Sequence, residues 1–567
     1  MWLVVVDTMQ IQPYIFGSNR LRENVGASYL VGAATGDWAF KAVRKVAPRN
    51  NIGRGNTLID GAWIERDNLD AEVLYAAGGN FVVLFGGDNE RAKGLAKQFT
   101  ALLSQHVLLE APGLQLVIAG QQMNWHEEAL RDKRIEVFHL LDVQKRTHAR
   151  SAPLLGLSVT AACRSTGLPA TGLVRGIGDE PPYLASDEIC AKVDVATRHG
   201  GTLSQADQRL QEVIGLAEGY SYPADFDDMG ATPGEYSHIA IVHADGNGVG
   251  QRIQEICNQH RKKEQNRDLV LALRHFSLNL AQAAQQALNA VLDSLKREID
   301  KRGGTSIVYE PNKELLIQID LVKNRKNDYY YLPFRPIVFG GDDVTFVCDG
   351  RLGLSLATMY LREFEKRTAA AKLGKDGGSL TACAGIAIVK SHYPFARAYE
   401  LADELSKTAK SYRTKEKIAG SCLDWHFALS GLGGSITEIR KREYKVEAGD
   451  LALRPVTLGA TPEHFQRAWP VVRAGIDAFQ GEEWVGRRNK MKALRDSLRE
   501  GTDAVKHFIA TFNNGRSLPR VLSGMDEWPS SGWQGGYCGY FDAIELVDWF
   551  ISLEGEADAT PANEPVS

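Results

Sequence analysis

Several features are missing from this 567-residue sequence, and each absence narrows the possible functions. No apolar run approaches the length needed to cross a membrane. The seven cysteines include no Cys-x-x-Cys pair, so neither a zinc knuckle nor a disulfide framework is predicted. The net charge of −4 provides no overall basic field, so any binding of nucleic acid must be local. The apolar start, residues 1–7, lacks the basic residues and length of a signal peptide. We therefore expect a reducing, cytoplasmic setting without membrane contact.

The most informative stretch is Gly340-Gly341-Asp342-Asp343, which lies between the β-type runs 335–339 and 344–348. Glycines and an aspartate between such runs predict a tight hairpin with two adjacent carboxylates at its tip. Adjacent carboxylates repel each other unless a cation or a proton holds them. Taken alone, the stretch fits a solvated turn equally well.

The same order of predicted elements occurs twice along the chain. In each copy a strand ends on an aspartate, Asp7 or Asp245, and helical residues, a Gly-Gly hairpin, a helix, a strand and a final helix follow. The first hairpin contains Gly78-Gly79-Asn80 and therefore lacks the carboxylate pair. This order predicts an internal duplication of two ferredoxin-like units with antiparallel sheets.

The predicted fold class is therefore α/β (α+β), with two ferredoxin-like units in tandem and a C-terminal helical domain. The expected boundaries are a first unit at 1–150, a connector at 151–235, a second unit at 236–440, a helical domain at 441–553 and a disordered tail at 554–567.

The second copy carries the residues that suggest chemistry. Asp245 ends its first strand, and Asp342 and Asp343 cap the hairpin predicted to pair beside that strand, so three carboxylates should meet at one edge of the sheet. Hard oxygen ligands suit Mg²⁺ or Mn²⁺, and two such ions can activate an attacking hydroxyl and stabilise a leaving pyrophosphate.

The loop after Asp245 reads Gly246-Asn247-Gly248 and leads into a helix, where a triphosphate can accept backbone N–H hydrogen bonds. Alone, this loop also fits a calcium loop or a simple turn. Lys410 near the end of the last helix can neutralise a triphosphate, although helix C-termini favour lysine in any case. No Walker A sequence occurs, which argues against an ordinary P-loop ATPase.

These motifs together resemble a known family. Residues 244–248, 340–343 and 402–410 are similar to palm-domain nucleotidyl cyclases of the GGDEF type. More narrowly, residues 1 to about 430 resemble the palm portion of the large subunit of type III CRISPR effectors (the "Cas ten" family), which makes cyclic oligoadenylates from ATP.

The resemblance implies roles for individual residues. Asp245, Asp342 and Asp343, with the Gly246 backbone, would bind two Mg²⁺ or Mn²⁺ ions. The residues expected to contact nucleotides are Gly246, Asn247, Gly248, Gly340, Gly341, Lys410 and Ser28. The first copy would be catalytically silent, and its Ser28 would contact the acceptor nucleotide, although a structural role for Ser28 as a cap is equally plausible.

Two departures from the family pattern affect the expected partners. The chain contains no His-Asp dipeptide, so the family's nuclease activity is not expected. Between the two copies only Cys163 and Cys190 stand where the family has a zinc cluster, so no zinc is expected. Both departures favour a stand-alone signalling enzyme in antiviral defence, whose product would activate a companion effector.

Three functions remain open from the sequence. The first is a pyrophosphate-releasing nucleotidyltransferase that joins ATP into a cyclic or linear oligonucleotide. The alternative is a non-enzymatic scaffold of a CRISPR-like complex, which would contact RNA and protein partners through the short basic runs 323–326 and 487–492. A template-dependent polymerase would need a basic channel that the charge balance does not suggest.

Overall fold

The computed structural model describes most of the chain. The described residues are 1–77, 79–147, 159–198, 203–216, 218–230, 237–301, 303–312, 315–324, 328–428, 434–460 and 465–553. Gly78, residues 325 and 326 of one basic run, and the C-terminal tail lie outside them.

The first unit is built on a four-stranded antiparallel sheet in the order β2-β3-β1-β4. One of its two central strands, at residues 2–9, contains three consecutive valines. These β-branched residues favour an extended backbone. The elements are β1 (Trp2–Met9), α1 (Ile11–Phe16), α2 (Leu21–Thr35), α3 (Asp37–Val46), β2 (Ala71–Ala77), β3 (Asn80–Phe85), α4 (Asn89–Glu110), β4 (Gln115–Gln122) and α5 (Leu130–Thr147). This is the ferredoxin-like strand order expected from the sequence.

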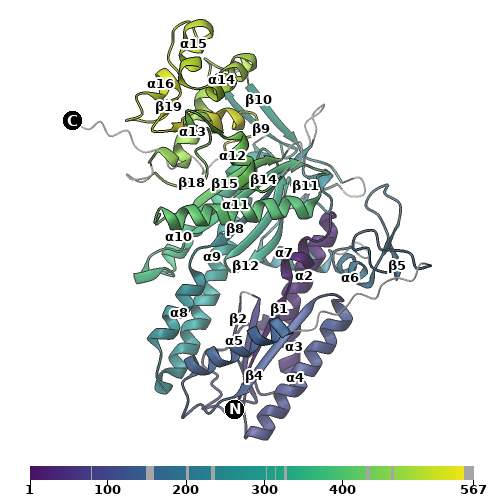
Figure 1. The fold of residues 1–567 in the computed structure, drawn as a ribbon. Helices are drawn as coiled ribbons and strands as arrows, with labels where there is room; N and C mark the ends of the chain where they lie inside the picture. Colours follow the sequence, from purple (N-terminus) through teal and green to yellow (C-terminus); the bar gives the residue numbers. More distant parts are fainter. Residues whose placement is uncertain are drawn as a thin grey trace.

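The second unit repeats this arrangement in a six-stranded sheet in the order β12-β13-β8-β14-β15-β18, which occupies the middle of the molecule (Figure 1). Its elements are β8 (His238–Gly246), α8 (Val249–Gln259), α9 (Asn266–Asp300), β9 (Ser306–Asn312), β10 (Leu315–Asp320), β11 (Tyr330–Tyr331), β12 (Phe334–Gly340), β13 (Asp343–Asp349), α10 (Gly353–Ala370), β14 (Ala382–Lys390), α11 (Phe395–Lys415), β15 (Cys422–Ala428) and β18 (Val456–Thr457).

Helices cover both faces of the second sheet. Along β8, Ala240 and Val242 face the hydrophobic cluster that contains α9 and α10, whereas Ile239 and Ile241 face the cluster that contains α11. Because side chains alternate along a strand, Asp245 lies on the α11 face. The strand-end carboxylate therefore points away from α9 and α10.

The two units are joined by matching contacts at the edge strands β2 and β12 of their sheets. Both β12 and β2 carry an irregularity in register at one residue, Ile337 and Leu74 respectively. The Ser28 hydroxyl of α2 donates a hydrogen bond to the Ile337 carbonyl, and Arg274 Nε of α9 donates one to the Leu74 carbonyl at 3.1 Å. Each unit thus places one helix, α2 or α9, against the edge strand of the other unit's sheet, and Figure 1 shows α2 and α9 running between the two sheets.

The connector and the C-terminal part complete the fold. The connector forms β5 (Gly172–Val174), β6 (Tyr183–Ala185), α6 (Asp187–Val195), α7 (Gln205–Val213) and β7 (Tyr220–Ser221). The C-terminal part contains α12 (Ile436–Glu443), α13 (Trp469–Gln480), α14 (Arg488–Glu500), α15 (Thr502–Phe512), α16 (Trp528–Ser531) and α17 (Phe541–Leu546). It also contains a small sheet in the order β16-β17-β20-β19, from β16 (Lys445–Val446), β17 (Gly449–Asp450), β19 (Trp533–Gln534) and β20 (Tyr537–Cys538), which the sequence did not predict.

Candidate active site

The predicted carboxylates meet at one end of the second sheet. Strands β8 and β13 are antiparallel, and their register places Asp343 directly opposite Asp245. Gly340 pairs with Asp343 across the hairpin, which leaves Gly341 and Asp342 as a two-residue turn. Directly opposite residues have Cβ atoms about 5 Å apart and share one face of the sheet. Asp245 and Asp343 therefore form a cross-strand pair of like charge.

Gly246 allows Asp342 to join this pair. The Gly246 N–H donates to the Asp342 carbonyl at 3.0 Å, and a Cβ atom added to Gly246 would lie 2.6 Å from the Asp342 Cβ atom. Any side chain at position 246 would therefore displace Asp342. The close approach explains why glycine follows the strand-end aspartate.

The loop that follows is less available to an anion than the sequence suggested. The N–H groups of Gly246 and Asn247 already donate to the carbonyls of Asp342 and Thr381, and the Asn247 side-chain amide donates to the Thr381 hydroxyl at 3.0 Å. Backbone contacts to phosphate would thus come from Gly248 and the first turn of α8, whose N–H groups have no partner within the helix.

Lys410 neutralises the strand-end carboxylate. Its Nζ donates to Asp245 Oδ2 at 2.5 Å and to the Gly246 carbonyl at 3.2 Å. Helix α11 can approach the sheet because residue 385 is glycine; a Cβ atom there would lie 2.0 Å from the Ala402 carbonyl oxygen. Lys407, three residues earlier on the same helix, pairs instead with Asp403. Of the two lysines, Lys410 is the one placed at the carboxylates.

The first unit has the same lysine contact but no carboxylate pair. Lys145 near the end of α5 pairs with Asp7, as Lys410 pairs with Asp245. The register of β1 and β3, in which Val6 lies opposite Phe81, continues to place Asn80 opposite Asp7. Asn80 therefore occupies the position that Asp343 has in the second unit.

Crowding and burial disfavour full ionisation of the cluster. The Asp343 side chain is 46 % exposed, but its Oδ1 atom is buried and has no hydrogen-bond partner among the described residues. Burial, followed by the charges of Asp245 and Asp342, raises the pKa of Asp343 to about 8. Burial and the Asp245 charge also raise the pKa of Asp342. Near neutral pH the cluster therefore holds a proton unless a cation replaces it.

The donor set suits a hard divalent cation that is completed by other ligands. No three acidic, histidine or cysteine side chains of the described ranges form a ready-made ion cluster. Mg²⁺, however, usually takes only one or two protein carboxylates and keeps waters or substrate phosphates as further ligands. Three neighbouring carboxylates, one with a buried oxygen that lacks a hydrogen bond, fit that requirement.

We expect binding of Mn²⁺ to release close to one proton per chain at pH 7. The raised pKa of Asp343 keeps a proton in the folded cluster until about pH 8, whereas an ordinary aspartate loses it near 3.8. The apparent affinity should therefore rise up to about pH 8 and then level off. In the metal-free protein, the free energy of unfolding should fall as the pH rises from about 4 to about 8, because over this interval only the folded chain holds the proton. Calorimetric titrations in two buffers with different ionisation enthalpies measure the released proton, and identical heats in both would contradict it.

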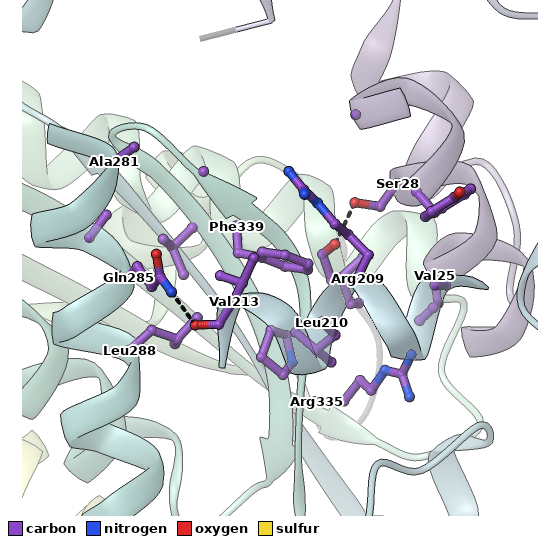
Figure 2. A pocket seen from close by; sticks show the side chains of 18 of the residues that line it. Val25, Ser28, Arg209, Leu210, Val213, Ala281, Gln285, Leu288, Arg335 and Phe339 are labelled. Carbon is purple, nitrogen blue, oxygen red and sulfur yellow. Dashed lines mark hydrogen bonds between the residues drawn. The ribbon is translucent and has the colours of Figure 1, made fainter. Parts of the chain in front are cut away.

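A cavity of about 240 Å³ lies beside the hairpin, between the two units. Helices α2, α7 and α9 and strand β12 surround it, and both Ser28 and Gly340 line it. Figure 2 shows Ser28 and Gln285 on opposite sides, with Arg209 of the connector helix beside Ser28. Apolar side chains form much of the remaining wall, among them Val25, Leu210, Ala284, Leu288, Ile337 and Phe339.

The sequence did not predict that the connector helix α7 forms one wall of this cavity. Helix α7 is fastened to the second sheet by an ion pair between Asp207 and Arg335, whose Nη2 lies 2.8 Å from Asp207 Oδ1. Both side chains are buried. The residue pattern after Ser204, which caps the helix, indicates a helix at 205–216 but not its place in the fold.

His243, Thr345 and Asp403 are further polar residues near the carboxylates that sequence reasoning missed. His243 Nδ1 lies 3.0 Å from the Thr345 hydroxyl and 3.4 Å from Asp343 Oδ1, and its Nε2 lies 3.8 Å from Asp403 Oδ1. Burial lowers the pKa of His243, with partial opposition from the Asp403 and Asp245 charges. A histidine two residues before a strand-end aspartate was the available signal, because that spacing puts both on one face.

Comparison with known proteins agrees with this geometry. Residues 238–419 match the family described as Cas10/Cmr2, second palm domain. This part of the chain is similar to a Cas10-type palm domain. The match covers β8 to α11 and contains Asp245, the hairpin carboxylates and Lys410. It confirms the family resemblance drawn from the sequence motifs.

The fold of the whole chain is similar to that of solved Cas10-type proteins. Csm1 from T. onnurineus aligns with a TM-score of 0.51 and 12 % identity, over 97 % of this chain and 69 % of that chain. A Csm1–Csm4 cassette in complex with AMPPNP aligns with a TM-score of 0.51 and 14 % identity over the same shares. A cassette in complex with cA3 also gives 0.51, at 12 % identity over 97 % and 69 %. At these identities the likeness shows the fold alone. We refer below to the first unit as the first palm and to the second unit as the second palm.

Two further findings bear on the sequence expectations. No curated protein matches this sequence significantly. Among the described residues, no helix combines the length and apolar character required of a membrane span.

Proposed function

We propose that this chain is a metal-dependent nucleotidyltransferase that converts ATP into a cyclic oligonucleotide, with release of pyrophosphate, as a signal in antiviral defence. The observation that carries the proposal is the cross-strand pair of Asp245 and Asp343, with Lys410 at the pair. The cavity reaches the same hairpin at Gly340, on the side of the sheet that α9 covers. The similar Csm1–Csm4 cassettes in complex with AMPPNP and with cA3 support ATP as the substrate and a cyclic oligoadenylate as the product.

In this proposal Asp245, Asp342 and Asp343 hold two Mg²⁺ or Mn²⁺ ions. Such ions lower the pKa of an attacking hydroxyl and stabilise the charge on a leaving pyrophosphate. Lys410 and the N-terminus of α8 hold the triphosphate, because both present positive charge or free N–H groups beside the carboxylates. Lys410 then exchanges part of its contact with Asp245 for phosphate oxygens.

The cavity is the proposed pocket for a nucleobase. Its volume and its apolar walls suit a flat heterocycle, and the polar groups of Ser28, Arg209 and Gln285 can contact the edge of a base or a ribose. The first palm and the connector provide the Ser28 and Arg209 sides of this pocket. This arrangement gives the silent first palm a role in binding without a role in chemistry.

The similar structures also suggest a protein partner. Csm1 occurs there with Csm4, and we propose that the present chain likewise assembles with a CRISPR-type partner. A companion effector that responds to the product is a further part of the proposal. The scaffold alternative shares this partner but predicts no turnover of ATP.

Incubation of the purified chain with ATP and Mn²⁺ tests the proposed function. We expect pyrophosphate and a new oligonucleotide product, and neither from Asp342→Ala/Asp343→Ala, because this variant lacks two of the three carboxylates. Candidate RNA and a partner subunit should be added in parallel, in case activity depends on them. Failure of the unaltered chain to form product under all these conditions would leave the scaffold alternative as the better explanation.

A further inference from the structure

The duplication gives this protein an internal comparison for the residues beneath its carboxylates. In the second palm, the next residues on the same face are Thr345 and His243, which lie directly opposite each other. In the first palm the corresponding pair, two residues below Asp7 and Asn80, is Val5 opposite Val82. The same position of the same fold is thus polar in one copy and apolar in the other.

Helix α11 also carries a polar residue at a position where the equivalent helix of the first palm, α5, carries an apolar one. The lysines that contact the strand-end aspartates, Lys410 and Lys145, mark equivalent positions in α11 and α5. Asp403 lies seven residues before Lys410, and the residue seven before Lys145 is Phe138. The second palm therefore has three polar side chains, from β8, β13 and α11, where the first palm has two valines and a phenylalanine.

Two of these side chains, His243 and Thr345, are buried, Asp403 is half-buried, and His243 lies next to Asp343. The His243 side chain is 4 % exposed, and Thr345 is fully buried. The His243 ring lies between the Thr345 hydroxyl, the buried Asp343 Oδ1 and Asp403, and its face is fixed by an edge contact with the Tyr399 ring at 5.5 Å. A buried polar layer costs stability relative to a well-packed apolar one, and Val5 and Val82 show that an apolar layer fits this fold. Stability alone therefore does not account for the polar residues at this position of the second palm.

We propose that His243 and Thr345 are positioning residues that fix the buried oxygen of Asp343, so that its other oxygen is held toward the cleft. The proposal rests on the proposed function, in which Asp343 is a ligand of the divalent cation. Groups that orient a ligating carboxylate are commonly worth 10- to 100-fold in metal affinity or activity. The first palm, which has no carboxylate at Asn80, has no use for such a layer.

The test copies the apolar pair of the first palm into the second, as His243→Val/Thr345→Val. Because this pair already packs in a sheet of the same architecture, the variant should fold and keep or raise its thermal midpoint. We expect its Mn²⁺ affinity, measured by electron paramagnetic resonance of free Mn²⁺, to fall about 10- to 100-fold, with a similar fall in product formation. His243→Asn, whose amide nitrogen can stand in for Nδ1, should recover much of the lost affinity.

A matched control separates positioning from general effects of burial. Thr358→Val removes an equally buried hydroxyl from α10 and should leave Mn²⁺ affinity unchanged. If the double variant does not fold, Thr345→Val alone provides the same comparison. Unaltered Mn²⁺ affinity in the folded variant would overturn the positioning role. Absence of both Mn²⁺ binding and product in the unaltered chain would instead refute the proposed function.

Discussion

Asp245→Asn is expected to lower the rate of product formation by at least about a thousandfold, whereas Asp7→Asn should lower it by no more than about threefold. The two substitutions are chemically identical and stand at equivalent strand ends, each beside a lysine. Only Asp245 lies opposite a second carboxylate, Asp343. An amide is a poor ligand for a hard cation, and a loss of several kcal/mol in stabilisation corresponds to a thousandfold or more in rate.

The measurement is the initial rate of pyrophosphate release at saturating ATP and Mn²⁺, with the thermal midpoint of each variant as a check on folding. Both substitutions remove one lysine–carboxylate contact at a partly exposed site, so their effects on stability should be similar and small. Comparable rates for the two variants would show that the second palm is not the catalytic one, and would remove the basis for the roles of Asp342 and Asp343 as well.

The features of this site that sequence could predict are local ones. Strand alternation and hairpin chemistry act over a few residues, so a strand ending at Asp245 and a tight turn at Gly341 and Asp342 follow from composition and spacing. The repetition of this order then indicated that strand and hairpin lie side by side. The structure adds the register, which sets Asp343 opposite Asp245. A slip of one residue would have placed the two carboxylates on opposite faces, and nothing local distinguishes these outcomes.

Other features depend on contacts between distant segments. Helix α7 was expected only as part of a connector, and its place at the cavity is set by the buried pair of Asp207 with Arg335, more than a hundred residues away. His243 and Thr345 looked like ordinary strand residues, because their burial follows from the approach of α11. The loop N–H groups of Gly246 and Asn247 looked free, because their acceptors belong to other loops.

Loss of the Glu72 carboxylate is expected to destabilise the protein strongly. It is fully buried in β2 of the first palm, where its carboxylate accepts hydrogen bonds from Arg267 at 2.6 Å and Arg274 at 3.0 Å, both on α9 of the second palm. Glu72→Ala would leave two largely buried guanidinium groups with only their more exposed carboxylate partners, Glu65 for Arg267 and Asp60 for Arg274. Removal of one member of a buried ion pair typically costs about 3–5 kcal/mol.

The expected loss can be measured locally as well as globally. Hydrogen exchange of the β2 amides should show a fall of about 3–5 kcal/mol in the free energy of opening, and the first thermal transition should fall by on the order of 10 °C. Glu400→Ala removes the same type of side chain from a pair with Arg397 that is exposed on both sides, and should cost less than about 1 kcal/mol. Equal effects of the two substitutions would mean that the Glu72 contacts do not hold the palms together.

The position of Glu72 also connects stability to the cleft. Arg274 donates both to Glu72 and to the Leu74 carbonyl, the counterpart of the Ile337 carbonyl that Ser28 contacts at the cavity. Loosening α9 from β2 would change the spacing of the palms at both contacts, because a helix of each palm contacts the edge strand of the other palm's sheet. Glu72→Ala should therefore weaken ATP binding, seen as a raised KM, at temperatures where the variant is still folded. A variant that is destabilised but keeps an unchanged KM would show that the Ser28 contact alone sets the shape of the nucleotide cleft.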